Sequence, residues 1–193
     1  MIYVIRHGQT ELNSRGVLQG RSDRPLNETG IAQAREAAER LSGIRFDRVY
    51  TSPLMRAMQT AQILAPDIVP VVDERLIEMD YGPYEGADLN HLPPEVLRFF
   101  SDFAHNPAPA GMEALEAVVH RAGDFLEERC RTGENILIST HAIAMKGILE
   151  YLTPGANGAY WSKYIGNCAV YSTEYRGGGF IVPAELDRME ERT

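Results

Sequence analysis

Two histidines and two arginines are the residues best suited to chemistry in this chain. Arg6 and His7 directly follow an apolar run, whereas His141 and Arg56 lie shortly after two further segments that indicate strands. Guanidinium forks match the geometry of phosphate oxygens, and surrounding cations should keep an imidazole unprotonated at neutral pH. A neutral imidazole can then act as a nucleophile. Together the four side chains predict an anion site that transfers a phosphoryl group, although a lone histidine is more often structural.

The segments around these residues alternate between short β-rich runs and helical periods, which is typical of an α/β sheet covered on both faces. Strands are predicted at residues 2–5, 47–50, 69–72 and 135–139. Helices are predicted from Asn27 to about 41, from Ser52 to about 64, from 113 to about 126 and from 142 to 151. Ligands of open α/β sheets bind at the carboxyl ends of strands, so the four polar side chains should converge there. Helices that begin at Ser52 and just past His141 would add their positive N-terminal ends.

The C-terminal part of the chain predicts an antiparallel addition to a mostly parallel sheet. Residues 169–175 and 180–182 flank Arg176-Gly177-Gly178-Gly179, a turn-forming run that indicates a hairpin. The charged tail after Pro183 is interpreted as a frayed helical turn. We therefore predict a three-layer α/β/α sandwich whose mostly parallel sheet has an antiparallel edge strand.

Residues 79–112 differ in composition from the rest of the chain. They contain several prolines, and a short helix is expected near residues 95–103. The segment holds one arginine, five acidic residues and five aromatic residues. We predict a single domain over residues 1–193, in which residues 79–112 form a lid-like insertion.

The run Arg6-His7-Gly8-Gln9-Thr10-Glu11-Leu12-Asn13 resembles the signature of the histidine phosphatase superfamily, also called the phosphoglycerate mutase-like family. Three further runs resemble later motifs of that family in the same order, and these are Ser52-Pro53-Leu54 with Arg56-Ala57, Glu78 with residues 82–86, and Ser139-Thr140-His141. The resemblance covers most of the chain. It implies a phosphoglycerate mutase-like fold for the predicted sandwich.

The resemblance also implies roles for single residues. His7 would accept the phosphoryl group, and the phosphate would lie among Arg6, Arg56 and His141. Glu78 would protonate the leaving oxygen and then activate water, and a leaving alkoxide needs such a proton donor on chemical grounds too. A surface acid is the alternative for Glu78 on spacing alone. Further substrate-binding residues would be Asn13, Gln19 and Gly20.

Charge and composition limit the partners of the protein. A formal net charge of −8 argues against nucleic acid or an anionic membrane, and favours a small phosphorylated metabolite bound in a local cationic pocket. The apolar run at residues 2–5 directly follows Met1, which leaves no room for a signal peptide, and no apolar stretch has the roughly 18 residues of a membrane helix. Cys130 and Cys168 lack metal-ligand neighbours. We therefore expect a cytoplasmic protein with reduced thiols, no metal and no cofactor, and the sequence leaves its oligomeric state open.

Three functions are compatible with the resemblance. A phosphatase passes the phosphoryl group to water, whereas a phosphoglycerate mutase returns it to a sugar acid. A mutase must also bind a carboxylate and a second phosphate, and these buried anions require cations in the lid. The acidic, aromatic composition of residues 79–112 therefore favours a phosphatase whose substrate has a neutral, cationic or apolar organic part. A non-catalytic phosphate-binding module is the least favoured function, because the set of polar residues is intact.

Overall fold

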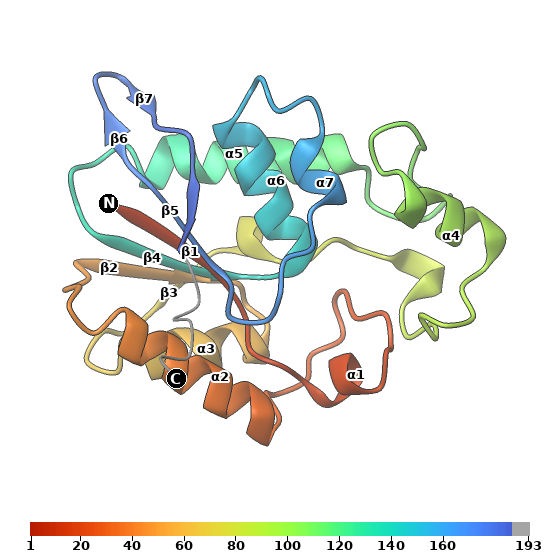
Figure 1. Ribbon diagram of the computed structural model, residues 1–193, viewed down its shortest axis with the longest axis horizontal. Helices are drawn as coiled ribbons and strands as arrows, with labels where there is room; N and C mark the ends of the chain where they lie inside the picture. Colours follow the sequence, from red (N-terminus) through yellow and green to blue (C-terminus); the bar gives the residue numbers. More distant parts are fainter. Residues whose placement is uncertain (187–193) are drawn as a thin grey trace, which may run out of the picture.

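Figure 1 shows the computed structural model of the chain, in which residues 1–186 are described. A six-stranded sheet has the strand order β3-β2-β4-β1-β5-β8. Its strands are β1 (Ile2–Arg6), β2 (Arg48–Thr51), β3 (Val71–Val72), β4 (Ile136–Thr140), β5 (Val170–Thr173) and β8 (Ala184–Leu186). The pairs β3/β2, β2/β4 and β4/β1 are parallel, whereas β1/β5 and β5/β8 are antiparallel. The predicted mostly parallel sheet with an antiparallel edge is confirmed.

Helices cover both faces of the sheet and complete the three layers (Figure 1). One face carries α2 (Glu28–Arg40) and α3 (Met55–Leu64), and the other carries α5 (Leu115–Arg129) and α6 (Ala142–Leu152). The remaining helical elements are short, and these are α1 (Glu11–Ser14), η1 (Glu74–Leu76), η2 (Gly82–Tyr84), α4 (Pro94–Ser101) and α7 (Ala159–Ser162). Among the described residues no helix has the length and apolar character needed to cross a membrane.

Strand β1 shows how the apolar run after Met1 holds the two layers of helices on the sheet. Successive side chains of a strand point to opposite faces. Ile2 and Val4 pack with residues of α5 and α6, whereas Tyr3 and Ile5 pack with residues of α2 and α3. All four are buried. Because the strand is fixed on both faces, the position at which Arg6 and His7 leave the sheet is fixed as well.

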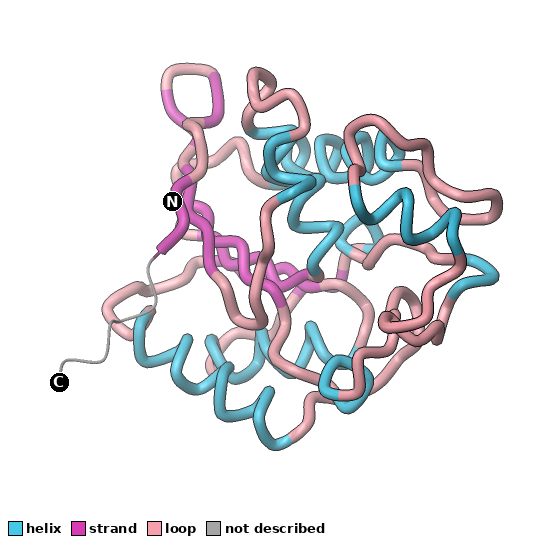
Figure 2. Tube along the Cα trace, turned by 45° about the vertical axis from the view of Figure 1, so that its right-hand side comes forward, coloured by secondary structure: helices cyan, strands magenta, loops and turns pink. Residues whose placement is uncertain are grey.

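Residues 79–112 lie beyond the carboxyl ends of the parallel strands (Figure 1). Their apolar side chains join a third hydrophobic cluster, separate from the two on the faces of the sheet. Most of this segment is loop, and α4 is its one longer helix, as the tube in Figure 2 shows. Met79, Tyr81 and Phe99 are buried against residues of α5, α6 and α7. The short helix predicted near residues 95–103 is present as α4, residues 94–101.

The C-terminal elements differ from the prediction. Within the tail after Pro183, residues 184–186 pair with β5 as the edge strand β8 and do not form the predicted helical turn, and residues 187–193 lie outside the described residues. The predicted hairpin is divided between two sheets. Val170 and Tyr171 are almost fully buried, so β5 pairs inside the main sheet with β1 and β8, while β6 (Tyr175–Arg176) and β7 (Gly179–Phe180) form a separate hairpin.

Candidate active site

The carboxyl ends of β2, β4 and β1 bring the predicted site residues together. These strands are neighbours in the sheet. The His7 N–H donates to Thr140 O at 2.9 Å, and the Ser52 N–H donates to Ser139 O at 3.0 Å. Just beyond these bonds, the imidazole rings of His7 and His141 have their centres 5.1 Å apart. The convergence that the strand ends predict is therefore present.

His7 is held in one neutral tautomer. Its Nδ1 lies 2.6 Å from Gly8 O, which can only accept, so Nδ1 carries the hydrogen. Arg56 Nε donates to His7 Nε2 at 3.1 Å, so Nε2 carries the lone pair. Burial, and then the charges of Arg56 and Arg6, hold the pKa of His7 well below its usual value. The imidazole is therefore neutral near pH 7, and its nucleophilic atom is Nε2.

His141 and Arg6 each have a buried polar atom without a hydrogen-bond partner among residues 1–186. His141 Nε2 lies 2.7 Å from Ser52 Oγ, whereas its Nδ1 has no partner. Arg6 Nη1 donates to Ile165 O at 2.6 Å, whereas its Nε has no partner. Burial, and then the charges of Arg56 and His7, hold the pKa of His141 well below its usual value. Since buried polar atoms are nearly always bonded, these two atoms indicate a place built for a polar ligand.

Arg56 is fully buried, and each nitrogen of its guanidinium group is bonded. Besides the bond from Nε to His7, Nη1 donates to Ser22 O at 2.8 Å and Nη2 donates to Gly20 O at 2.7 Å. Burial lowers the pKa of Arg56 to about 10, so the group stays charged at neutral pH. Two carbonyl groups of one loop thus hold this cation beside the nucleophilic nitrogen.

Glu85 organises the loop that holds Arg56. Its carboxylate accepts hydrogen bonds from the backbone N–H groups of Gly20, Arg21 and Ser22, and from the Ser22 hydroxyl. Gly20 has no room for a side chain, because a Cβ there would lie 2.6 Å from Met79 O. Sequence analysis missed this role of Glu85. The run at residues 82–86 includes the residue, but its partners lie more than 60 positions earlier in the chain.

Glu78 packs against the first turn of α6, the helix that begins directly after His141. The side chain is buried, with 3% of its surface exposed. Its Oε1 accepts from the N–H groups of Met79 and Ala144, both at 2.9 Å. Its Oε2 accepts from the Ile143 N–H alone, at 3.2 Å. The alternative of a surface acid is therefore wrong, and the carboxyl group has a fixed position beside the two arginines, which both feel its charge.

Helix α6 begins just past His141, as predicted, whereas the predicted start of α3 at Ser52 is wrong. The first turn of α6 donates to Glu78, as described above. Helix α3 begins at Met55 rather than at Ser52, and the Met55 N–H donates to Asp23 Oδ1 at 2.7 Å. The Ser52 hydroxyl instead lies against His141. Carboxylates of the protein thus occupy both helix ends.

Asn13, Gln19 and Gly20, the further predicted binding residues, form bonds within the protein. Asn13 Oδ1 accepts from the Thr10 N–H in a reciprocal capping box at the start of α1. Gln19 Oε1 accepts from Thr10 Oγ1 at 2.6 Å, and Gly20 O accepts from Arg56. These bonds order the chain that follows His7. Contact of the three residues with substrate stays a prediction.

The five acidic residues of residues 79–112 all have partners within the protein. The partners are Arg21 for Asp80, the loop 20–22 for Glu85, His91 for Asp88, Tyr84 for Glu95 and His105 for Asp102. Of these partners Arg21 carries a full positive charge, whereas Tyr84 is a neutral donor and His91 and His105 are charged only when protonated. The expectation of a neutral, cationic or apolar organic part, which rests on composition, stays a prediction.

Lys146 is a buried cation close to the site that sequence analysis did not single out. It lies on α6, and 8% of its surface is exposed. Its Nζ donates to Trp161 O at 2.6 Å and lies 5.1 Å from the centre of the Phe103 ring. Burial lowers the pKa of Lys146 to about 8, with Glu78 opposing this change and Arg6 adding to it. The signal in the sequence is a lysine inside an otherwise apolar helical run.

Comparisons with known proteins identify the family. The sequence model that describes the histidine phosphatase superfamily (branch 1) matches residues 2–186 of this chain. The chain therefore belongs to this superfamily. It is an enzyme of the phosphatase and mutase-like class that the fold and the site define.

Named relatives include phosphatases and a mutase. The putative phosphoserine phosphatase 2 of Hydrogenobacter thermophilus is 32% identical over 183 residues, which cover 91% of this chain and 90% of that protein. A 2,3-bisphosphoglycerate-dependent phosphoglycerate mutase of Methylobacterium sp. is 32% identical, covering 79% of this chain and 80% of that protein. A phosphoserine phosphatase mutant from Entamoeba histolytica, solved in complex with phosphoserine, has a TM-score of 0.86 at 26% identity, covering 97% of each chain.

Proposed function

We propose that the protein hydrolyses small phosphomonoesters through a phosphohistidine formed at Nε2 of His7. The observation that carries this proposal is the fixed tautomer of His7, which presents a lone pair on Nε2 beside the Arg56 guanidinium. A neutral, oriented imidazole needs no further base before it attacks phosphorus. The positive groups around it then stabilise the charge on the transferring phosphoryl oxygens.

Substrate binding exchanges one hydrogen bond of Arg56. In the structure its Nε–H donates to the same nitrogen that has to attack. We propose that the incoming phosphate takes this N–H, while Arg56 stays attached to the loop through Gly20 O and Ser22 O. The unpartnered Nε of Arg6 and Nδ1 of His141 supply further donors. Asn13, Gln19 and Gly20 are proposed to border the same phosphate.

Glu78 is proposed as the proton donor for the leaving oxygen. Its Oε2 receives one hydrogen bond, whereas its Oε1 receives two, so Oε2 is the oxygen better placed to carry a proton. In the first step the proton moves from Oε2 to the departing alkoxide as the phosphorus–oxygen bond breaks. In the second step the carboxylate takes a proton from the water that attacks phosphohistidine, which releases inorganic phosphate and restores His7.

Phosphoglycerate mutase activity is the second candidate, and the Methylobacterium mutase among the relatives favours it. The two functions are separated by a phosphate-release assay and a coupled mutase assay on the same preparation. We expect release of inorganic phosphate, with negligible interconversion of 2- and 3-phosphoglycerate even when bisphosphoglycerate is supplied to phosphorylate His7. Mutase turnover that exceeds phosphate release on every substrate tested would overturn the proposal.

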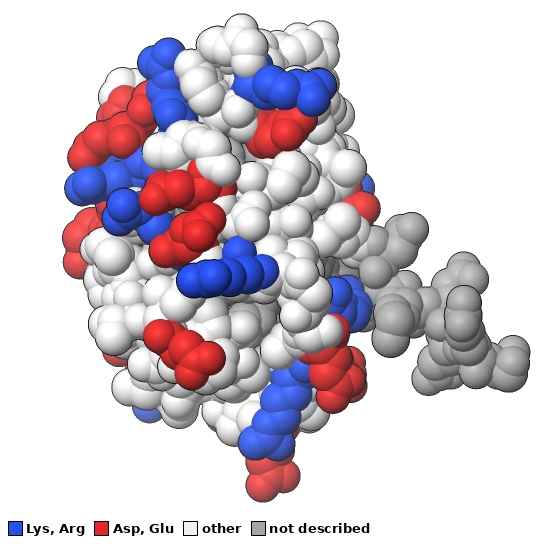
Figure 3. All heavy atoms as spheres, turned by 90° about the vertical axis from the view of Figure 1, so that its left-hand side faces the viewer, with Lys and Arg blue, Asp and Glu red and all other residues white. Residues whose placement is uncertain are grey.

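We further propose a small phosphorylated metabolite as the partner of a single-domain, cytoplasmic protein, with residues 79–112 as its lid. Nucleic acid and membranes are not proposed as partners. The net charge of −8 supports this, and Figure 3 shows a face on which positive and negative side chains are interspersed. Such a surface does not attract a polyanion strongly.

Replacing Glu85 with glutamine should lower kcat/KM about 10-fold or more. Glutamine offers one acceptor oxygen to donors from Gly20, Arg21 and Ser22, so the loop would lose the bonds that fix its carbonyl groups toward Arg56. The measurement is phosphate release from p-nitrophenyl phosphate over a range of substrate concentrations. Glu95→Gln is the matched control, because Glu95 lies in the same segment and accepts from Tyr84 OH. Equal kcat/KM values for the two variants would show that Glu85 does not position Arg56.

A further inference from the structure

A cavity of about 690 Å³ lies between the loop after α4 and the segment around α7. Its walls include the aromatic residues Phe100, Phe103, Trp161 and Tyr164, together with Lys146. Aromatic walls bury the organic part of a small ligand, and a few polar groups select it. The cavity therefore has the composition of a binding site for the part of a substrate that is not phosphate.

Two contacts link the wall of this cavity to Arg6 of the phosphate site. In one of them, Arg6 Nη1 donates to Ile165 O, directly after Tyr164 of the cavity wall. In the other, Phe100 of the wall stacks on Tyr81, with ring centres 6.1 Å apart, and Tyr81 is near enough to Arg6 for the guanidinium charge to act on its pKa. A phosphomonoester held by Arg6 can thus extend its organic part along this wall.

Lys146 has no direct ion-pair partner among the described residues of this wall, although the charge of Glu78 acts on it from the phosphate site. Among residues 1–186, no carboxylate forms an ion pair with it. One of its three N–H hydrogens goes to Trp161 O, and the Phe103 ring lies beside the ammonium group. A buried charge is ordinarily paired, and leaving it unpaired costs stability. The arrangement is explained if an anion from outside the chain supplies the missing partner.

Other charged groups of the same wall are already paired. Lys163 Nζ lies 2.8 Å from Glu185, and Asp102 lies 2.8 Å from His105. Lys163 therefore has a partner of opposite charge, whereas the hydrogen bond to His105 fixes the position of Asp102.

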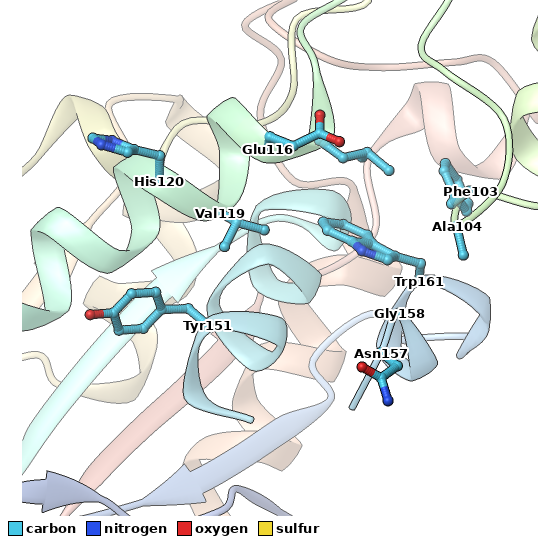
Figure 4. Close-up of a pocket in the computed structure, with 10 residues that line it drawn as sticks. Phe103, Ala104, Glu116, Val119, His120, Tyr151, Asn157, Gly158 and Trp161 are labelled. Carbon is cyan, nitrogen blue, oxygen red and sulfur yellow. The ribbon is translucent and has the colours of Figure 1, made fainter. Parts of the chain in front are cut away.

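A second cavity, of about 550 Å³, shares Phe103 and Trp161 with the first and is shown in Figure 4. Its other walls come from α5 and from the end of α6, with Val119 and Tyr151 facing the hollow. No lysine or arginine lines it. The buried cation therefore belongs to the cavity next to the phosphate site, where a substrate can reach it.

We propose that Lys146 binds a carboxylate on the organic part of the substrate while Arg6, Arg56 and His141 hold its phosphate. The inference rests on the proposed phosphatase function and narrows it to small phosphomonoesters that also carry a carboxylate. It differs from the expectation of a neutral, cationic or apolar organic part, which considered the composition of residues 79–112 alone. Lys146 lies outside that segment, so the composition omits this cation.

The test uses two pairs of substrates that differ in the carboxylate, namely phosphoserine with phosphoethanolamine, and 3-phosphoglycerate with glycerol 3-phosphate. Phosphate release gives the ratio of kcat/KM within each pair. The wild type should favour the carboxylate member about 10-fold or more, as for one charge-assisted hydrogen bond, and Lys146→Met and Lys146→Gln should lose this preference. Lys163→Met is the matched control, because Glu185 already neutralises Lys163, and it should keep the wild-type ratio.

Thermal unfolding is measured first, and only variants that show a folded state are compared. Equal kcat/KM within both pairs for the wild type, or a preference that survives in both Lys146 variants, would overturn the subsite. If neither the four compounds nor p-nitrophenyl phosphate releases phosphate, the proposed hydrolysis is wrong, and a binding measurement tests the role of Lys146 separately. Calorimetry on His7→Ala should then show a carboxylate preference of about 10-fold or more that disappears when Lys146→Met is added, and persistence of the preference would contradict the subsite.

Discussion

Replacing His7 with alanine is expected to lower phosphate release from every substrate roughly 10³-fold or more, as the loss of a nucleophile does in other enzymes. The variant removes Nε2, the atom whose lone pair faces Arg56. The phosphate donors Arg6, Arg56 and His141 remain, so binding should weaken far less than turnover. Steady-state kinetics and calorimetry with inorganic phosphate measure the two quantities separately.

His91→Ala is the matched control for this experiment. His91 is exposed and lies against Asp88, so its removal should leave turnover near that of the wild type. Retention of a tenth or more of wild-type turnover in His7→Ala would show that another residue is the nucleophile.

The second large effect is expected for Glu78→Gln, and it should depend on the leaving group. A general acid contributes about 10²- to 10⁴-fold where the leaving oxygen needs a proton. Alkyl phosphates should therefore slow roughly 10²-fold or more. Turnover of p-nitrophenyl phosphate should fall much less, because its phenolate leaves without a proton. The measurement is kcat for both substrates with the wild type and the variant.

Glutamine keeps an oxygen for the N–H groups of Met79 and Ala144 and loses the acceptor of the weaker bond from the Ile143 N–H, so two of the three bonds to this side chain remain. Glu74→Gln, which changes an exposed acid four residues earlier, controls for the general loss of a negative charge. Equal slowing of alkyl and p-nitrophenyl substrates would mean that Glu78 acts mainly as the base in hydrolysis or is not the proton donor.

The convergence of His7, Arg56 and His141 could be predicted because local patterns were sufficient. His7 and His141 follow runs whose apolar character indicates a strand buried on both faces, and Arg56 follows the strand predicted at residues 47–50. Parallel strands end at one edge of a sheet, so residues far apart in the chain meet there. The three-layer fold was predictable for the same reason, since the alternation of strands and helices is written in short-range periodicity.

The partners of the buried polar groups could not be predicted, because they come from distant parts of the chain. Asp23 accepts from the first N–H of α3, where the local pattern indicated Ser52 as the cap, and the Ser52 hydroxyl lies against His141 instead. Glu85 looked like one of several acids until the backbone N–H groups around it were known. Composition gives the number of charges in a segment, but only the fold shows which of them are neutralised.

The tail after Pro183 shows a different limit. Its charged residues suggested a helical turn, yet residues 184–186 form an edge strand on β5. An edge strand needs one neighbour with free backbone groups, and β5 supplies them. Tyr171 of β5 also donates to Glu185, so a charged side chain is compatible with this position. The pairing of β8 with β5 depends on the backbone of β5. The residues of the tail therefore show no local sequence pattern that predicts this strand.

The central claim, that the phosphoryl group is carried on Nε2 of His7, is tested most directly by trapping the phosphoenzyme. Wild-type protein is mixed rapidly with p-nitrophenyl phosphate, quenched, digested and examined by mass spectrometry and ³¹P NMR under alkaline conditions. We predict phosphate on His7 at Nε2, stable in alkali, lost in acid, formed at least as fast as steady-state turnover and absent from His7→Ala. Phosphate on Nδ1 or on another residue, or turnover without any phosphorylated histidine, would contradict the claim.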